Sequence, residues 1–131
     1  MGHAMRASDL KWGPVPPVLP KGGQLAVLAG DPTKEGLFVI RIKAQAGYKI
    51  PAHHHPTDEL VTVISGTFAV GMGDKLDEAK ADQLKAGDFV SLPKNMNHFA
   101  MAPVESVVEI SSMGPFQITY VNPADNPNVT Q

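Results

Sequence analysis

The chain has 131 residues, of which 43% are hydrophobic and 18% are charged, the balance of one globular domain with its own core. The formal net charge is -2 and no basic run occurs, which argues against a nucleic-acid partner. No apolar run has the length that crosses a bilayer, so no membrane partner is expected.

The chain contains no cysteine, which excludes disulfides and thiolate metal sites. The first residues contain no basic-then-apolar leader. These features suit the cytoplasm, or the periplasm if a leader has been removed, and they do not choose between the two.

Residues 1–23 are rich in proline and glycine and indicate an extended N-terminal arm rather than a helix. The arm carries Trp12, the only tryptophan, and the apolar residues Val18 and Leu19. One interpretation places the arm against its own domain. The other lets it cross to a second subunit, because extended apolar segments often bury themselves in a partner.

Residues 24–121 are predicted to form the domain itself, built from strands and turns. Period-two patterns and Gly, Pro and Asn turns predict strands at 24–29, 37–43, 89–92, 97–101, 104–112 and 116–121. Residues 59–72 are predicted to form a hairpin that turns at Ser65 and Gly66. Residues 74–81 are the one predicted helix, with Asp74 as its N-cap. Residues 122–131 are polar and are expected to be loose. This pattern predicts an all-β barrel or sandwich.

Residues 47–66 carry the strongest chemical signal. Because residues two apart on a strand share a face, His53 and His55 are predicted to converge while His54 faces away. Glu59 follows at the head of the next strand and adds a carboxylate. Imidazole and carboxylate together bind divalent transition metals. The competing interpretation is a surface histidine cluster that takes up stray nickel.

Two spaced motifs resemble those of the cupin superfamily. The first comprises Gly47, His53, His55, Glu59 and Gly66, and the second comprises Gly87, Pro93 and His98. Asn95 stands where the family usually has Gly, and Ala102 where it often has Asn. The first departure is mild, because Asn tolerates a left-handed turn.

The resemblance implies a small jelly-roll-like β-barrel of two packed antiparallel sheets. One divalent transition metal per chain (Mn, Fe, Ni, Zn, Co or Cu) would lie inside, held by His53, His55, Glu59 and His98. Four ligands on a six-coordinate ion leave two adjacent places for water, substrate or dioxygen.

The resemblance also implies a metal-dependent enzyme that acts on a small organic molecule. The leading interpretation is oxygenase-type chemistry with Glu59 as a base. The residues equally allow lyase or isomerase chemistry. A non-catalytic ligand-binding module and a barrel with a structural metal are the alternatives.

The lining of the cavity is predicted to be apolar, which favours an apolar or aromatic substrate. The candidate wall residues are Phe38, Tyr48, Phe68, Met72, Phe99, Met101 and Phe116. Glu109 becomes a second acid or base only if its face of strand 104–112 lines the cavity. The opposite face is more apolar and is the default core. Exposed sheet edges need cover, so a homodimer is expected, with the arm and one sheet at the interface.

Overall fold

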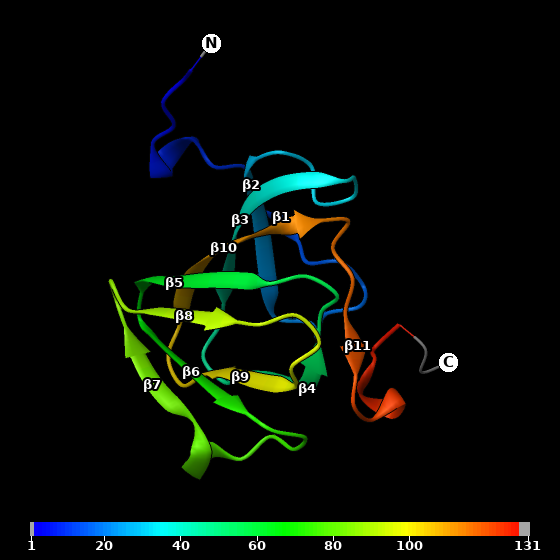
Figure 1. Ribbon diagram of the computed structural model, residues 1–131. Coiled ribbons are helices and arrows are strands. Elements are labelled where there is room, and N and C mark those ends of the chain that lie inside the picture. Colours follow the sequence, from blue (N-terminus) through cyan, green and yellow to red (C-terminus); the bar gives the residue numbers. More distant parts are fainter. Residues whose placement is uncertain (1, 129–131) are drawn as a thin grey trace.

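The computed structural model describes residues 2–128 and shows two antiparallel β-sheets that pack face to face (Figure 1). The strands of the first sheet are β1 (Gly13–Pro14), β2 (Gly23–Ala29), β3 (Gly36–Ala44), β5 (Glu59–Ser65), β8 (Phe89–Leu92) and β10 (Ser106–Gly114). The second contains β4 (Tyr48–His54), β6 (Thr67–Met72), β7 (Asp82–Lys85), β9 (His98–Ala102) and β11 (Thr119–Tyr120). Within residues 2–128, helix is limited to the 3-10 turns η1 (Ala7–Asp9), η2 (Glu78–Lys80) and η3 (Pro123–Asp125).

The strand order is β1-β2-β3-β10-β5-β8 in the first sheet and β11-β4-β9-β6-β7 in the second. This architecture confirms the predicted all-β, jelly-roll-like fold of two antiparallel sheets. None of the helical segments in residues 2–128 is long and apolar enough to cross a bilayer.

The core lies between the sheets and follows the period-two pattern of the sequence. Strand β3 buries Phe38, Ile40 and Ile42, and its partner β10 buries Val108 and Ile110. The alternate positions face outward. The core therefore forms where the apolar face of each strand predicts it.

Glu109 lies on the outer face of β10. Its carboxylate pairs with the Arg41 guanidinium at 3.0 Å, on the neighbouring strand β3. Glu109 therefore does not line the cavity and is no candidate for a second acid or base there. The opposite, more apolar face of β10 forms the core, as predicted.

The predicted hairpin over residues 59–72 is wrong in its pairing, although both strands exist. β5 pairs with β10 and β8, whereas β6 belongs to the other sheet and pairs with β9 and β7. At the corner, Gly66 has a φ of 80°, and a Cβ there would meet the backbone of Glu105. The Ser106 hydroxyl accepts from the Thr67 N–H at 3.1 Å and donates to the Thr67 carbonyl at 2.8 Å. The turn thus carries the chain from one sheet to the other.

The predicted helix over residues 74–81 is also wrong. Only η2 forms, and its N-cap is Asp77, whose side chain accepts from the Ala79 N–H at 3.0 Å. Leu76 and Ala81 pack instead on a small cluster on the outer face of the second sheet. Their spacing of five residues does not fit one face of a helix. Packing on the sheet therefore decides the conformation of this segment.

Two short strands were missed and one was predicted too long. β1 has two residues, and β7 has four. Of residues 116–121, only Thr119–Tyr120 pair as a strand, against β4. Short edge strands carry little periodic signal, which explains these differences.

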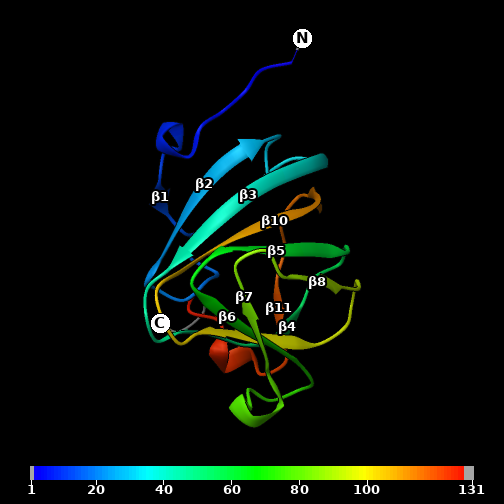
Figure 2. The ribbon, with the colours of Figure 1, turned by 90° about the vertical axis from the view of Figure 1, so that its left-hand side faces the viewer.

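The N-terminal arm contacts its own domain. β1 pairs with β2, the Lys43 ammonium lies 4.4 Å from the centre of the Trp12 ring, and Leu19 is buried in the main core. The end of the chain before η1 extends away from the two sheets (Figure 1 and Figure 2). The homodimer stays a prediction.

Gly71 offers a test of packing in the second sheet. It pairs with Phe99 across β6 and β9, and a Cβ at Gly71 would collide with the Phe99 ring, which is fully buried. Gly71→Ala should lower the free energy of unfolding by about 1–3 kcal/mol in urea denaturation, because the ring has no room to move. Gly13→Ala is the matched control, since its Cβ meets nothing within 4 Å and should change stability by less than about 0.5 kcal/mol. Equal stability of the two variants would contradict this packing.

Candidate metal centre

An irregularity in β4 aims the first histidine into the molecule. Tyr48 and Ile50 belong to the main core, whereas Ala52 belongs to the cluster on the outer face of the second sheet. The register of β4 against β9 shifts between Ile50 and His53. Such a bulge re-aims side chains. His53 therefore faces the core and pairs directly with His98 across the ladder.

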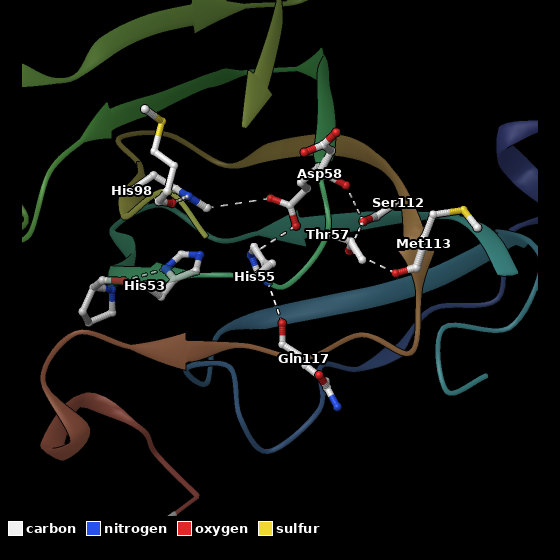
Figure 3. Close-up of polar contacts among 11 residues, drawn as sticks. His53, His55, Thr57, Asp58, His98, Ser112, Met113 and Gln117 are labelled. Carbon is white, nitrogen blue, oxygen red and sulfur yellow. Dashed lines mark hydrogen bonds and ion pairs between the residues drawn. The ribbon is translucent and has the colours of Figure 1, made fainter. Parts of the chain in front are cut away.

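Three buried histidines converge between the sheets (Figure 3). The ring centres of His53 and His98 are 4.3 Å apart, those of His53 and His55 are 4.9 Å apart, and those of His55 and His98 are 5.4 Å apart. One ring nitrogen from each lies within 4.8 Å of the others. The structure therefore brings His98 from the second motif to the histidines of the first. His54 lies outside this cluster, with its Nδ1 3.0 Å from the Asn97 amide oxygen.

Glu59 is buried beside the three rings. Its Oε2 lies 3.3 Å from Nε2 of His55, and its Oε1 lies 3.9 Å from Nε2 of His98. All four residues expected as metal ligands therefore lie together. Within residues 2–128, the three histidines alone form a group close enough to hold a metal ion, and Glu59 is not part of that group. Glu59 as a fourth ligand stays a prediction.

Backbone carbonyls fix the tautomer of each ring. Nδ1 of His53 lies 2.7 Å from the Pro51 carbonyl, and Nδ1 of His98 lies 3.1 Å from that of Met96. Nδ1 of His55 lies 2.7 Å from the Gln117 carbonyl (Figure 3). A carbonyl only accepts, so each Nδ1 carries the proton and donates it, which leaves the Nε2 lone pair free.

The free lone pairs fit a metal ion. Nε2 of His98 is buried and has no hydrogen-bond partner among the described residues. An unpaired buried polar atom is costly, and histidines that ligate metals typically donate their other N–H to a carbonyl. The three buried histidines could therefore hold a divalent transition metal, and the nitrogen-rich donor set suits several first-row ions.

Burial pushes every group of the site toward its neutral form. It lowers the pKa of His53 to about 2 and also lowers the pKa values of His55 and His98. Burial raises the pKa of Glu59 to about 7, against the opposing effect of His98. The imidazoles therefore stay unprotonated at neutral pH, which is the form that ligates a metal.

The turn that leads into Glu59 is fixed by hydrogen bonds (Figure 3). The Ser112 hydroxyl donates to the Asp58 carbonyl at 2.6 Å, and the Thr57 hydroxyl donates to the Met113 carbonyl at 3.1 Å. Sequence reasoning missed these residues and the three orienting carbonyls. A single Ser or Thr side chain carries no sequence signal for such a role.

The second motif is tied to the first through the backbone. The N–H of Asn95 donates to the His55 carbonyl at 2.8 Å, and Asn95 has a φ of 62°. Asn therefore adopts the left-handed turn that the family usually gives to Gly, as expected. Ala102, the other departure, is buried where β9 pairs with Tyr48, at the opposite end of β4 from His53.

A small apolar cavity adjoins the histidines. Its volume is about 40 Å³, enough for two or three water molecules. The residues that line it are Leu19, Ile42, Tyr48, Ile50, His53, His55, Glu59, Val61, Phe68, Val70, Leu92, His98, Ala100, Val108, Ile110 and Phe116.

The predicted wall is therefore right in part. Tyr48, Phe68 and Phe116 line the cavity. Phe99 and Met101 belong to the outer cluster, because they face away on β9. Two further residues lie elsewhere: Phe38 is in the core outside the lining, and Met72 is exposed.

Residues 1–117 match the family model described as the ChrR cupin-like domain. The chain belongs to this cupin family. The match spans most of the chain and includes both histidine motifs, so the resemblance seen in the sequence is confirmed. A comparison with curated proteins found no match.

Solved structures share the cupin fold. The polyketide cyclase RemF from Streptomyces resistomycificus has a TM-score of 0.77 at 14% identity, covering 98% of this chain and 91% of that one. A putative acetylacetone dioxygenase from Methylibium petroleiphilum has a TM-score of 0.71 at 21% identity, covering 97% and 85%. Salicylate 1,2-dioxygenase from Pseudoaminobacter salicylatoxidans in complex with gentisate has a TM-score of 0.63 at 16% identity, covering 79% and 30%. The structural neighbours thus include cupin enzymes, and one of them is bound to a small aromatic molecule.

The raised pKa of Glu59 predicts a pH-dependent effect of its removal from metal-free protein. Below about pH 4.5 the carboxyl is protonated in both the folded and unfolded chains. As pH rises from about 4.5 to about 7, the carboxyl ionises in the unfolded chain but stays protonated in the folded one, so its burial increasingly destabilises the fold. Between pH 5 and pH 8, wild type should lose about 2 kcal/mol of stability relative to Glu59→Gln in urea denaturation.

The exposed carboxylate Glu105 supplies the control for this measurement. Glu105→Gln should follow the wild-type pH curve. Parallel curves for wild type and Glu59→Gln would show that Glu59 titrates as it does in the unfolded chain.

Proposed function

We propose that this cupin is a metal-dependent enzyme with oxygenase-type chemistry on a small apolar or aromatic molecule. The observation that carries the proposal is the convergence of three neutral imidazoles, each with a free Nε2, at one end of an apolar cavity. The proposed ligands are His53, His55, Glu59 and His98, with one metal per chain. When bound, the metal supplies Lewis acidity and a place where substrate and dioxygen are oriented.

Glu59 is the proposed base. With a divalent metal beside it, its carboxyl would be ionised, which is the form that accepts a proton. It is the one carboxylate among the residues that line the cavity. A substrate with an acidic C–H between two carbonyls would lose that proton to a Glu59 oxygen. The three imidazoles are poor candidates for this role, because their Nδ1 protons are held by carbonyls and their Nε2 atoms face the proposed metal.

The size and lining of the cavity narrow the substrate class. The cavity has a volume of only about 40 Å³ and a mostly apolar lining, which favours a small apolar or aromatic molecule over one as large as a flavonol. Acetylacetone, named for one structural neighbour, and gentisate, bound to another, are both small organic molecules. We therefore favour a small β-diketone or a small phenolic acid over larger substrates.

Lyase or isomerase chemistry that needs a second acid or base has less support. Glu109, the one candidate, is paired with Arg41 outside the cavity. The hydroxyls of Tyr48 and Tyr120 donate to backbone carbonyls of the arm. Glu59 therefore stands alone as the proton-accepting carboxylate of the cavity.

A binding module that holds a ligand without turning it over is the second candidate. It is favoured by the enclosure of the site, since both the histidines and Glu59 are almost fully buried. A ligand that co-purifies and is recovered unchanged after incubation with metal and air would support this alternative.

Single histidine substitutions test the metal site. His53→Ala, His55→Ala and His98→Ala should each weaken Zn²⁺ or Ni²⁺ binding by about a hundredfold or more in calorimetric titration. Each should also abolish the rise in melting temperature that metal gives to wild type. His54→Ala is the matched control, because His54 adjoins two of these residues yet lies outside the cluster, and it should bind within about threefold of wild type. Equal losses in all four variants would argue against the site.

Oxygen consumption tests the chemistry. Protein loaded with Fe²⁺, Mn²⁺, Ni²⁺ or Cu²⁺ should consume dioxygen with acetylacetone or a small phenolic acid. Glu59→Gln should reduce kcat by about a hundredfold or more while the substrate still binds, because a general base contributes on that order. Substrate binding without oxygen uptake, with every redox metal tried, would leave the binding module as the better description.

A further inference from the structure

The N-terminal arm forms part of the wall of the metal cavity. Leu19 is 5% exposed and lines the same cavity as the histidines and Glu59. It comes from the Pro-rich segment before β2, far in sequence from both motifs. The arm therefore does more than cover the outside of the sheets.

Leu19 is held between two tyrosines that come from the second sheet. The Pro20 carbonyl accepts from the hydroxyl of Tyr48, the first residue of β4, at 2.7 Å. Tyr120, whose hydroxyl holds Val18, pairs with His53, and the two ring centres are 5.9 Å apart. Leu19 and the histidines line one cavity, so a substrate held at the histidines would meet Leu19 as its apolar chain becomes longer.

Two tyrosines hold the arm on either side of Leu19. The Tyr48 hydroxyl donates to Pro20, and the Tyr120 hydroxyl donates to the Val18 carbonyl at 2.6 Å. Both tyrosine side chains are buried, and burial raises the pKa of Tyr48 to about 12, so its hydroxyl keeps its proton. Successive carbonyl partners around one residue fix the position of that residue.

The sequence of the arm makes this wall stiff. Prolines at 14, 16, 17 and 20 restrict the backbone and remove N–H groups that would need partners. The N–H of Leu19 itself donates to the Pro16 carbonyl at 3.0 Å. The tyrosine hydroxyls satisfy two of the remaining carbonyls. Leu19 is thus held in place by local turns and by two bonds from the domain.

We propose that Leu19, clamped by Tyr48 and Tyr120, is the specificity-determining residue that limits how long a substrate the metal cavity accepts. The inference rests on the proposed function for its substrate class, β-diketones with short apolar chains. The position of Leu19 in the cavity stands independently of the metal. The two can therefore be tested separately.

The first experiment uses the protein as purified and benzene as the probe, with binding measured by NMR titration. Leu19→Ala should bind benzene about tenfold more tightly than wild type, because the missing side chain enlarges an apolar cavity. Met101→Ala is the matched control. It also removes a buried side chain, but from the cluster on the outer face of the second sheet, and its benzene affinity should stay at the wild-type value.

The second experiment uses Zn²⁺-loaded protein and compares acetylacetone with its homologue lengthened by four methylenes. Leu19→Ala should bind the long diketone about tenfold or more tightly than wild type and leave the affinity for acetylacetone unchanged, since each buried methylene adds affinity. Tyr48→Phe and Tyr120→Phe should shift the same ratio in the same direction by a smaller factor. Met101→Ala should leave the ratio unchanged.

The outcomes separate this proposal from the proposed function. If Leu19→Ala gains benzene affinity but no variant binds any diketone, Leu19 still limits the cavity and the proposed substrate class is wrong. If Leu19→Ala changes neither benzene affinity nor the diketone ratio, the proposal is overturned, even when wild type consumes oxygen with acetylacetone. Should Leu19→Ala lose cooperative unfolding, Leu19→Val replaces it, with a gain of about threefold expected in both experiments.

Discussion

The candidate metal site holds hydrogen-bond acceptor atoms close together with no donor between them. This arrangement is unfavourable, and a bound cation or a proton would relieve it. Nε2 of His55 presents a lone pair to the Glu59 carboxylate at 3.3 Å, and Nε2 of His98 is buried without a partner among the described residues. Carbonyl oxygens at Nδ1 prevent the rings from turning their N–H groups toward the carboxylate. In the absence of a cation, the carboxyl is pushed toward its neutral form. The fold thus keeps these acceptor atoms close together and away from water.

The backbone around the site is organised to keep that arrangement. A bulge in β4 reverses the inward face just before His53. The turn after His55 is held by the Asn95 N–H, and the start of β5 is held by the Ser112 hydroxyl. Each of these bonds joins parts of the chain that are distant in sequence. The geometry of the candidate metal site therefore depends on both sheets and not on the histidine motif alone.

The grouping of the four candidate ligands was predictable from sequence because its signal is local. The spacing of His53, His55 and Glu59, with His98 in a second motif, identified four residues that the fold does bring together. Strand partners were less predictable. Nothing at Gly66 distinguishes a hairpin turn from a crossing between sheets, since both need a left-handed residue. The segment 74–81 has helix-forming residues, yet its contacts with the outer face of the second sheet determine its shape.

The cavity joins two parts of the molecule that the sequence keeps apart. Tyr120 pairs with His53 in the sheet, and its ring centre lies 5.9 Å from that of the histidine. Its hydroxyl meanwhile holds the arm at Val18. A displacement of the arm would therefore displace the Tyr120 ring, which lies beside His53. Since the tyrosine hydroxyl donates to the arm, the polar side chains left at the candidate metal site are the imidazoles and the Glu59 carboxylate. The bond from Tyr120 to Val18 thus positions the arm beside the cavity and also removes one hydroxyl from the candidate metal site.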